Sequence, residues 1–199
     1  MKKKTLNIPR PSSELVKSYN EQWEELEPFS VPSAALDILF TKTYPSNTDL
    51  KQILIKATAL NDLFKTNIMN IWPVAKHIKS LDIDKRLCEG DATLVNDLAS
   101  VDFGNDKLKN FYSFATKYCH FHQPGKFSIY DRYVANLLLH FKSVDKFYAF
   151  DAIDLRNYPK YLTILKAFQK HYGLTEFNQR QLDHYLWMAG KEYFGKPTL

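Results

Sequence analysis

The chain has 199 residues, 45% hydrophobic and 25% charged, so it is long enough to bury a core and has the composition of a folded globular protein. Aromatic residues reach 15%, whereas only 6 glycines are present, which disfavours sheet-rich folds that turn sharply every ten residues. The net charge is +5 and the pI about 9.0, which is compatible with a polyanionic partner.

Apolar residues recur at helical spacing along most of the chain, and no segment shows convincing strand alternation. We expect residues 1–12 to be a basic flexible arm and residues 13–199 to be a single all-α domain, a helical bundle of two closely packed lobes. The predicted helices, in chain order, cover about 13–26, with Pro28 as its end, then 33–42, 48–65, 70–81, 91–101, 107–121, 131–141, 159–172 and 178–194.

Compartment and cofactor requirements follow from what the sequence lacks. Cys88 and Cys119 show no CxxC spacing, so neither a disulfide framework nor a thiolate zinc site is expected. The lysines at the start are followed by a polar, proline-bearing stretch rather than an apolar signal segment, and no apolar run is long enough to cross a bilayer. We expect a cytoplasmic protein, or a nuclear one in a eukaryote, with no membrane association and no cofactor.

Positive charge is concentrated between Lys107 and Lys142. This window holds six basic residues and one acid, Asp131, a net +5 that equals the charge of the whole chain. Such a patch is typical of nucleic-acid binding, although a solvated basic helix face gives the same pattern.

Lys117 is the first candidate for chemistry. On a helix it lies beside Phe114 and Phe121, at spacings of minus three and plus four, and off the apolar stripe formed by Leu108, Phe111, Tyr112, Ala115 and Cys119. A lysine between aromatic rings loses hydration, which favours the neutral, nucleophilic amine. The alternatives are a surface lysine that lays its stem on the rings, or a plain phosphate contact.

Asp131 is the second candidate. It follows a turn at Gln123-Pro124-Gly125 and stands at the head of the next helix. A helix-capping role explains an aspartate there by itself, but capping also fixes the carboxylate for electrostatic or general-base work, so the two roles are compatible.

The segment from Leu108 to Lys142 resembles the helix-hairpin-helix DNA glycosylase superfamily, in particular its 8-oxoguanine DNA glycosylase branch. The resemblance rests on Ala115-Thr116-Lys117, Pro124 and Ser128-Ile129-Tyr130-Asp131. It implies that Lys117 attacks the sugar C1′ to form a Schiff base and that Asp131 activates the amine or stabilises charge on the sugar. The sequence departs from the family where Phe111 to Phe114 replace a Gly-x-Gly turn, and the spacing from Lys117 to Asp131 is short.

Several further residues are candidates for contact with DNA or with a base turned out of the duplex. They are Phe114, His120, Phe121, Lys126, Arg132, Trp187 and Phe194. Aromatic residues at helical spacing more often simply pack in a core, which is the alternative for Trp187 and Phe194. His120 and His122 form a His-x-His pair without a third ligand nearby, so we expect no metal site.

The sequence therefore favours a DNA base-excision glycosylase with accompanying lyase activity, whose partner is duplex DNA with a flipped base and which needs no obligate protein partner. Two alternatives remain: a non-catalytic DNA-binding module with the same fold, and a helical protein-interaction domain without a nucleic-acid role. The sequence does not identify the excised base.

Overall fold

A computed structural model describes residues 7–104 and 107–195 of the chain. The protein is mainly helical, which confirms the expected class. Its elements, in chain order, are α1 (Ser13–Glu25), α2 (Glu27–Ile38), the π-helical turn η1 (Leu39–Thr43), α3 (Leu50–Leu63), α4 (Ile71–Ser80), α5 (Asp84–Glu89), α6 (Leu94–Ala99), β1 (Ser100–Asp102), β2 (Leu108–Asn110), α7 (Tyr112–His122), α8 (Arg132–Asp145), the 3-10 helix η2 (Ala152–Arg156), α9 (Tyr158–His171) and α10 (Gln179–Phe194).

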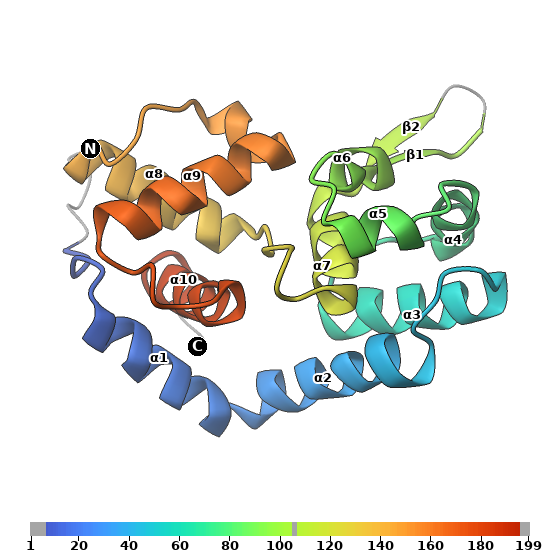
Figure 1. Cartoon of the computed structure of the whole chain (residues 1–199), viewed down its shortest axis with the longest axis horizontal. Helices are drawn as coiled ribbons and strands as arrows, with labels where there is room; N and C mark the ends of the chain where they lie inside the picture. Colours follow the sequence, from blue (N-terminus) through green and yellow to red (C-terminus); the bar gives the residue numbers. More distant parts are fainter. Residues whose placement is uncertain (1–6, 105–106, 196–199) are drawn as a thin grey trace.

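The helices form two lobes that lie side by side (Figure 1). Lobe A holds α3 to α7 and the antiparallel pair β1–β2, and lobe B holds α1, α8, α9 and α10. The chain passes between the lobes at α2, which runs along one side of both, and again in the segment between α7 and α8. Residues near each crossing therefore lie at the junction of the lobes.

Local capping explains why several helices begin where the sequence predicts. The side chains of Ser12, Asp49, Asn70, Asp131 and Asn178 each accept a hydrogen bond from a backbone N–H in the first turn of the helix that follows. Gly173, with φ of +68°, follows α9 in the left-handed region that glycine adopts easily. The helices predicted from Asn70, Asp131, Pro159 and Asn178 are confirmed.

Other boundaries differ from the prediction. The helix predicted over 13–26 does end before Pro28, at Glu25, but Pro28 lies in the first turn of the next helix, α2, where its missing N–H costs nothing. The helix predicted from Lys107 starts at Tyr112, because the residues before it pair in the β1–β2 hairpin. Leu108, expected in the apolar stripe, is therefore 69% exposed on β2. The predicted helix 91–101 is replaced by the short α6 followed by β1, and α5 was not predicted.

Part of the predicted flexible arm packs on lobe B. Ile8 and Pro11 are buried, and the Arg10 guanidinium forms an ion pair with Asp145 at 2.7 Å. Residues 7–12 are therefore anchored, because two apolar side chains and one charge find partners there. Residues 1–6 of the arm lie outside the described part of the chain.

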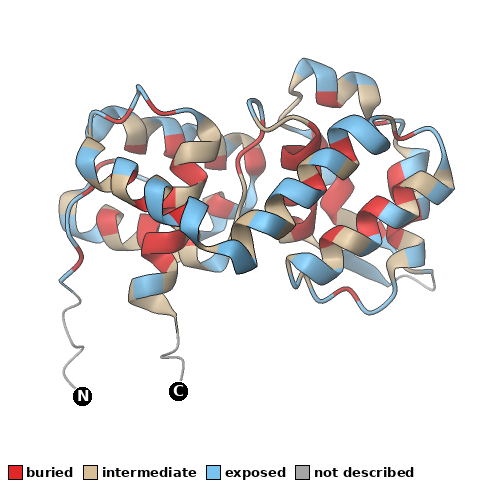
Figure 2. Ribbon diagram, turned by 90° about the horizontal axis from the view of Figure 1, so that it is seen from below, coloured by how far each residue is buried: buried red, intermediate tan, exposed pale blue. Residues whose placement is uncertain are grey.

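Buried apolar residues fill both lobes and form one connected core, visible as the buried segments in Figure 2. In lobe B, α8 and α10 approach closely at Gly190, where an added Cβ would lie 2.5 Å from the carbonyl oxygen of Tyr133. In lobe A, Lys56 is completely buried, and its Nζ donates to the carbonyls of Tyr44 and Ser46 and to Oδ1 of Asn47 at 2.8–2.9 Å. No described helix is both long enough and apolar enough for a membrane span.

Candidate active site

A cavity of about 360 Å³ lies at the junction of the lobes, within the size range of small-molecule sites. Both crossing segments line it, through Phe29 of α2 and through Ile129 and Asp131 before α8. Lobe A contributes the end of α3 and Lys117 of α7, and lobe B contributes α10. The lining residues are Trp23, Pro28, Phe29, Pro32, Leu63, Phe64, Lys65, Lys117, Ile129, Asp131, Tyr133, Val134, Asp183, His184 and Trp187.

Lys117 and Asp131, the two residues singled out for chemistry, meet in the wall of this cavity. The Nζ of Lys117 lies 4.0 Å from Oδ2 of Asp131, with side-chain exposures of 6% and 23%. The same Nζ donates a hydrogen bond to Oγ of Ser113, one turn earlier on α7, at 2.6 Å. The amine thus lies between a hydroxyl and a carboxylate that belong to different segments.

Burial lowers the pKa of Lys117, and the opposing influence of nearby carboxyl groups, chiefly the Asp131 carboxylate, offsets this only in part. The N-terminal end of α8, which carries the partial positive charge of a helix start, begins next to Asp131. Both effects favour the neutral amine, the form that attacks an electrophilic carbon.

Asp131 uses its two oxygens for different tasks. Oδ1 accepts the backbone N–H of Tyr133 at 2.8 Å and caps α8, while Oδ2 faces Lys117. The predicted capping role is therefore confirmed, and the cap directs the remaining oxygen toward the amine.

The segment before Asp131, Ser128 to Tyr130, is held from three sides. From α9, the hydroxyls of Tyr158 and Tyr161 donate to the carbonyls of Ser128 and Ile129 at 2.9 and 2.7 Å. From α7, Ser113 and Thr116 bond the backbone of Tyr130, and from α10, Asp183 accepts the N–H of Ile129. Because these side chains all bond the backbone of the segment, they hold the main chain that leads into Asp131 in one position.

Aromatic side chains form another part of the wall, which is called the aromatic wall below. Trp23 stacks on His184 with ring centroids 4.1 Å apart, and Trp187 meets Trp23 edge-on at 5.8 Å. The ring of Phe29 lies 5.0 Å from that of Trp187, and the Nζ of Lys191 lies over both rings. A flat apolar ligand would find faces and edges to pack against, next to one positive charge.

Asp183 is the polar group on this side of the cavity. It is 5% exposed and lines the cavity beside the aromatic wall. Burial raises the pKa of its carboxyl well above the usual range, although the N–H of Ile129 and nearby cations oppose the shift. His120 lies 3.6 Å away, but burial lowers the pKa of His120 to about 4 and its Nδ1 bonds the carbonyl of Phe127.

The remaining predicted site residues do not line this cavity. Phe114 and Phe121 are 1% exposed and pack against Tyr118 and Phe40 in the core, because α7 is enclosed on nearly all sides. His120 is equally buried behind Asp183. Phe194 lies at the end of α10 near His140.

The two predicted basic contacts, Lys126 and Arg132, are exposed but lie outside the lining. Lys126 donates to the carbonyl of Cys88, and the guanidinium of Arg132 lies over the ring of Tyr133.

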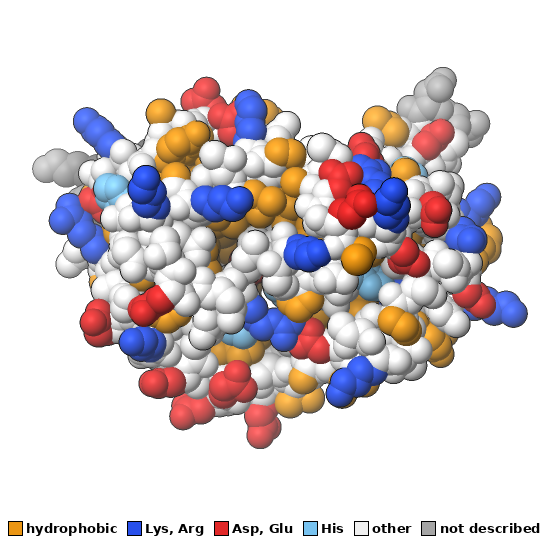
Figure 3. Space-filling model, viewed as in Figure 1, with side chains coloured by type: hydrophobic (Ala, Val, Ile, Leu, Met, Phe, Trp, Pro, Cys, Tyr) orange, Lys and Arg blue, Asp and Glu red, His pale blue; other side chains and the backbone are white. Residues whose placement is uncertain are grey.

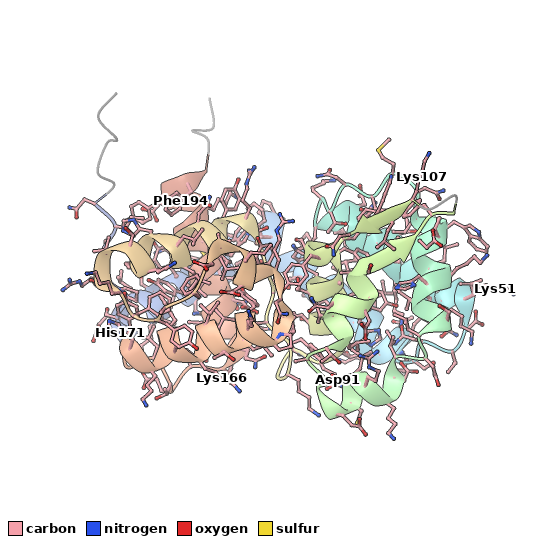
Figure 4. The ribbon with its side chains drawn as sticks, turned by 90° about the horizontal axis from the view of Figure 1, so that it is seen from above. Lys51, Asp91, Lys107, Lys166, His171 and Phe194 are labelled. Carbon is pink, nitrogen blue, oxygen red and sulfur yellow. The ribbon has the colours of Figure 1, made fainter. Side chains whose placement is uncertain are left out.

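The positive residues between 107 and 142 do not form one patch. Lys117 is buried, Lys142 bonds the carbonyl of Phe150, and Lys109 lies over the ring of Phe103 on the hairpin. Figure 4 shows Lys107 in lobe A, far from Phe194 in lobe B. On the face in Figure 3, basic and acidic side chains alternate over both lobes. The charge seen along the sequence is therefore dispersed in space.

Sequence reasoning found three residues of the cavity, Lys117, Asp131 and Trp187, and missed Trp23, Asp183 and His184. It also missed Ser113, which lies outside the lining and accepts the hydrogen bond of Lys117. One signal existed: Asp183 stands four residues before Trp187, so the two share a face of α10. Of the residues that the structure describes, no three of His, Cys, Asp or Glu gather as metal ligands do.

The sequence places the chain in a family. Residues 15–126 match the family model HI_0787_N, described as an N-terminal domain, and the chain belongs to that family. The matched residues run from α1 through α7, and so include Lys117 but not Asp131 or Asp183.

A relative from Haemophilus influenzae, described as an uncharacterized protein, is 48% identical over 151 residues, which cover 75% of this chain and 72% of the relative. No solved structure matches the chain.

Proposed function

We propose that this protein is a DNA base-excision glycosylase with lyase activity, which takes a base turned out of duplex DNA into the cavity between its lobes. The observation that carries the proposal is the meeting of Lys117 and Asp131, 4.0 Å apart, in the wall of one cavity. The support for a glycosylase-like fold is the two-lobed helical arrangement, with the lysine-bearing helix α7 in the wall of the cavity between the lobes.

The chemistry follows from the two side chains. The lone pair of the Lys117 amine attacks C1′ of the sugar, and the base leaves with the electron pair of the C1′–N bond and takes up a proton. Asp131 accepts one proton from the new C–N linkage. The sugar ring then opens as the C1′–O4′ bond breaks, O4′ takes that proton from Asp131, and a protonated imine, which keeps the second hydrogen of the amine, links Lys117 to C1′. Loss of the proton on C2′ then expels the 3′ phosphate.

The cavity suits such a ligand in shape and polarity. Its volume accommodates a planar base, and Trp23, Phe29 and Trp187 offer stacking surfaces. Lys191 at the aromatic wall and Lys65 at the end of α3 supply positive charge for the sugar-phosphate backbone. The DNA grip does not use hairpin glycines, since Phe111 and Tyr112 lead into α7.

The test is borohydride trapping on duplexes that carry an abasic site or a damaged base. We expect a covalent adduct with the wild type, none with Lys117→Ala, and an undiminished adduct with the matched control Lys126→Ala, which removes an exposed amine outside the cavity. Absence of an adduct with the wild type, or an adduct that survives Lys117→Ala, contradicts the proposal. Salt-sensitive DNA binding without excision would instead favour the non-catalytic module.

A further inference from the structure

A single hydroxyl connects the two groups that the proposed chemistry needs. Oγ of Ser113, in the first turn of α7, lies 2.6 Å from Nζ of Lys117 and 3.2 Å from the carbonyl oxygen of Tyr130. That carbonyl belongs to the peptide bond between Tyr130 and Asp131. Ser113 therefore contacts the amine on one side and the main chain that carries the acid on the other.

The direction of both hydrogen bonds follows from the donors available. A serine hydroxyl has one hydrogen and a carbonyl oxygen can only accept, so the hydroxyl of Ser113 donates to Tyr130. Oγ then has only lone pairs for Lys117, and Nζ must donate to it. Because one N–H of the amine is turned toward Ser113, the lone pair of the neutral amine lies on another side of Nζ.

We propose that Ser113 is a positioning residue, whose hydroxyl orients the Lys117 amine for attack and fixes its separation from Asp131. The side chain of lysine is flexible, and Oδ2 of Asp131, 4.0 Å from Nζ, is too far for a direct hydrogen bond to hold the amine. Within the described chain, the hydrogen bond of Nζ is the one to Ser113. This inference deepens the proposed function and rests on it.

Three variants separate orientation of the amine from anchoring of the segment before α8. Ser113→Ala removes both hydrogen bonds, whereas Ser113→Thr keeps a hydroxyl. Thr116→Val is the matched control, because the hydroxyl of Thr116 accepts the N–H of Tyr130 at 3.1 Å and donates to the carbonyl of Ser113, not to Lys117. It loosens the same segment from α7 and leaves the hydrogen bond of the amine in place.

The experiment measures the rate of borohydride trapping on a duplex with an abasic site, as a function of protein concentration. We expect Ser113→Ala to lower the maximal rate about tenfold or more and to keep the half-saturating concentration within about threefold, because a misdirected amine slows attack without weakening DNA binding. Ser113→Thr should restore the maximal rate to within about threefold of the wild type, and Thr116→Val should slow it less than about threefold.

The pH dependence of trapping separates orientation from protonation. The carboxyls of Asp131 and Asp183 and the ring of His120 lie near Lys117, and Lys65 lines the same cavity, so several groups influence the charge of the amine. At the alkaline plateau, where a higher pH no longer raises the rate, the amine is neutral in every variant. A positioning role keeps the deficit of Ser113→Ala at this plateau, whereas an effect on protonation alone disappears there.

Three results would overturn the inference: a Ser113→Ala rate close to that of the wild type, a deficit that vanishes at the plateau, or equal slowing in Thr116→Val and Ser113→Ala. Melting curves report whether each variant folds. If Ser113→Ala does not fold, Ser113→Cys replaces it, because a thiol is a weaker hydrogen-bonding group, and the same outcomes decide. Wild-type trapping that Ser113→Ala leaves intact sinks only the role of Ser113, whereas absence of wild-type trapping sinks the glycosylase-lyase chemistry.

Discussion

The close approach of α8 and α10 gives a quantitative prediction for Gly190→Ala. A Cβ at this position would lie 2.5 Å from the carbonyl oxygen and 2.7 Å from the carbonyl carbon of Tyr133. Both atoms belong to backbone in the first turn of α8, so no side-chain rotation relieves the clash and the two helices must move apart by about half an ångström or more.

The expected cost follows from two opposing effects. Overpacking of this kind costs about 1–3 kcal/mol, and replacing a helix-interior glycine with alanine returns at most about 1 kcal/mol. The net loss of about 1–2 kcal/mol should lower the melting temperature by roughly 2–8 °C in a domain of this size. Because Tyr133 stands two residues after Asp131, the shift also moves the carboxylate, and borohydride trapping should slow.

Thermal unfolding followed by circular dichroism measures the effect. Gly125→Ala is the matched control, because a Cβ there meets nothing within 4 Å and the position has no positive φ. Its melting temperature should equal or slightly exceed that of the wild type. If Gly190→Ala melts at the wild-type temperature, the packing argument for α8 and α10 is wrong.

Three further predictions concern single groups. Lys56→Met should lower the urea-unfolding free energy by about 1–3 kcal/mol, because the carbonyl oxygens of Tyr44 and Ser46 lose their donor, whereas Oδ1 of Asn47 keeps the hydroxyl of Tyr118; an unchanged unfolding free energy would refute this. Asp131→Asn should keep the helix cap, so its unfolding free energy should stay within about 0.5 kcal/mol of the wild type, yet it should trap abasic DNA at least tenfold more slowly. Asp131→Ala should trap as slowly and should also lose about 1 kcal/mol of unfolding free energy, because the cap is removed. Burial lowers the folded-state pKa of His184 to about 4, so between pH 6.5 and 4 the unfolded chain binds more protons than the folded one, and the unfolding free energy should fall as the pH falls. His184→Gln should make this pH dependence less steep in urea titrations. An unchanged pH dependence in the variant would contradict the prediction.

The sequence predicted the structure correctly where the start or end of a helix is determined by neighbouring residues. A capping side chain, a proline in a first turn or a glycine after a last turn acts on neighbouring residues, and α4, α8, α9 and α10 follow such signals. The same holds for the capping role of Asp131, because its hydrogen-bond partner, the N–H of Tyr133, is only two residues away in the sequence.

The sequence predictions were wrong or incomplete where the position of a residue depends on packing between elements that are distant in the sequence. Ten of the eleven residues of α7 are buried, so the helix has no solvent face, and a stripe argument does not apply to Phe114 or Phe121. Nothing near Asp183 in sequence shows that Ile129, on another segment, bonds one of its oxygens. The dispersal of the basic residues likewise depends on how the hairpin, α7 and α8 are placed in space.

The most direct test of the account is to map the trapped adduct. Wild-type protein reacted with an abasic duplex under borohydride, then digested and analysed by mass spectrometry, should carry the sugar remnant on the peptide that contains Lys117. An adduct on another lysine, such as Lys65 or Lys191 near the same cavity, or no adduct at all, would contradict the assignment of Lys117 as the nucleophile.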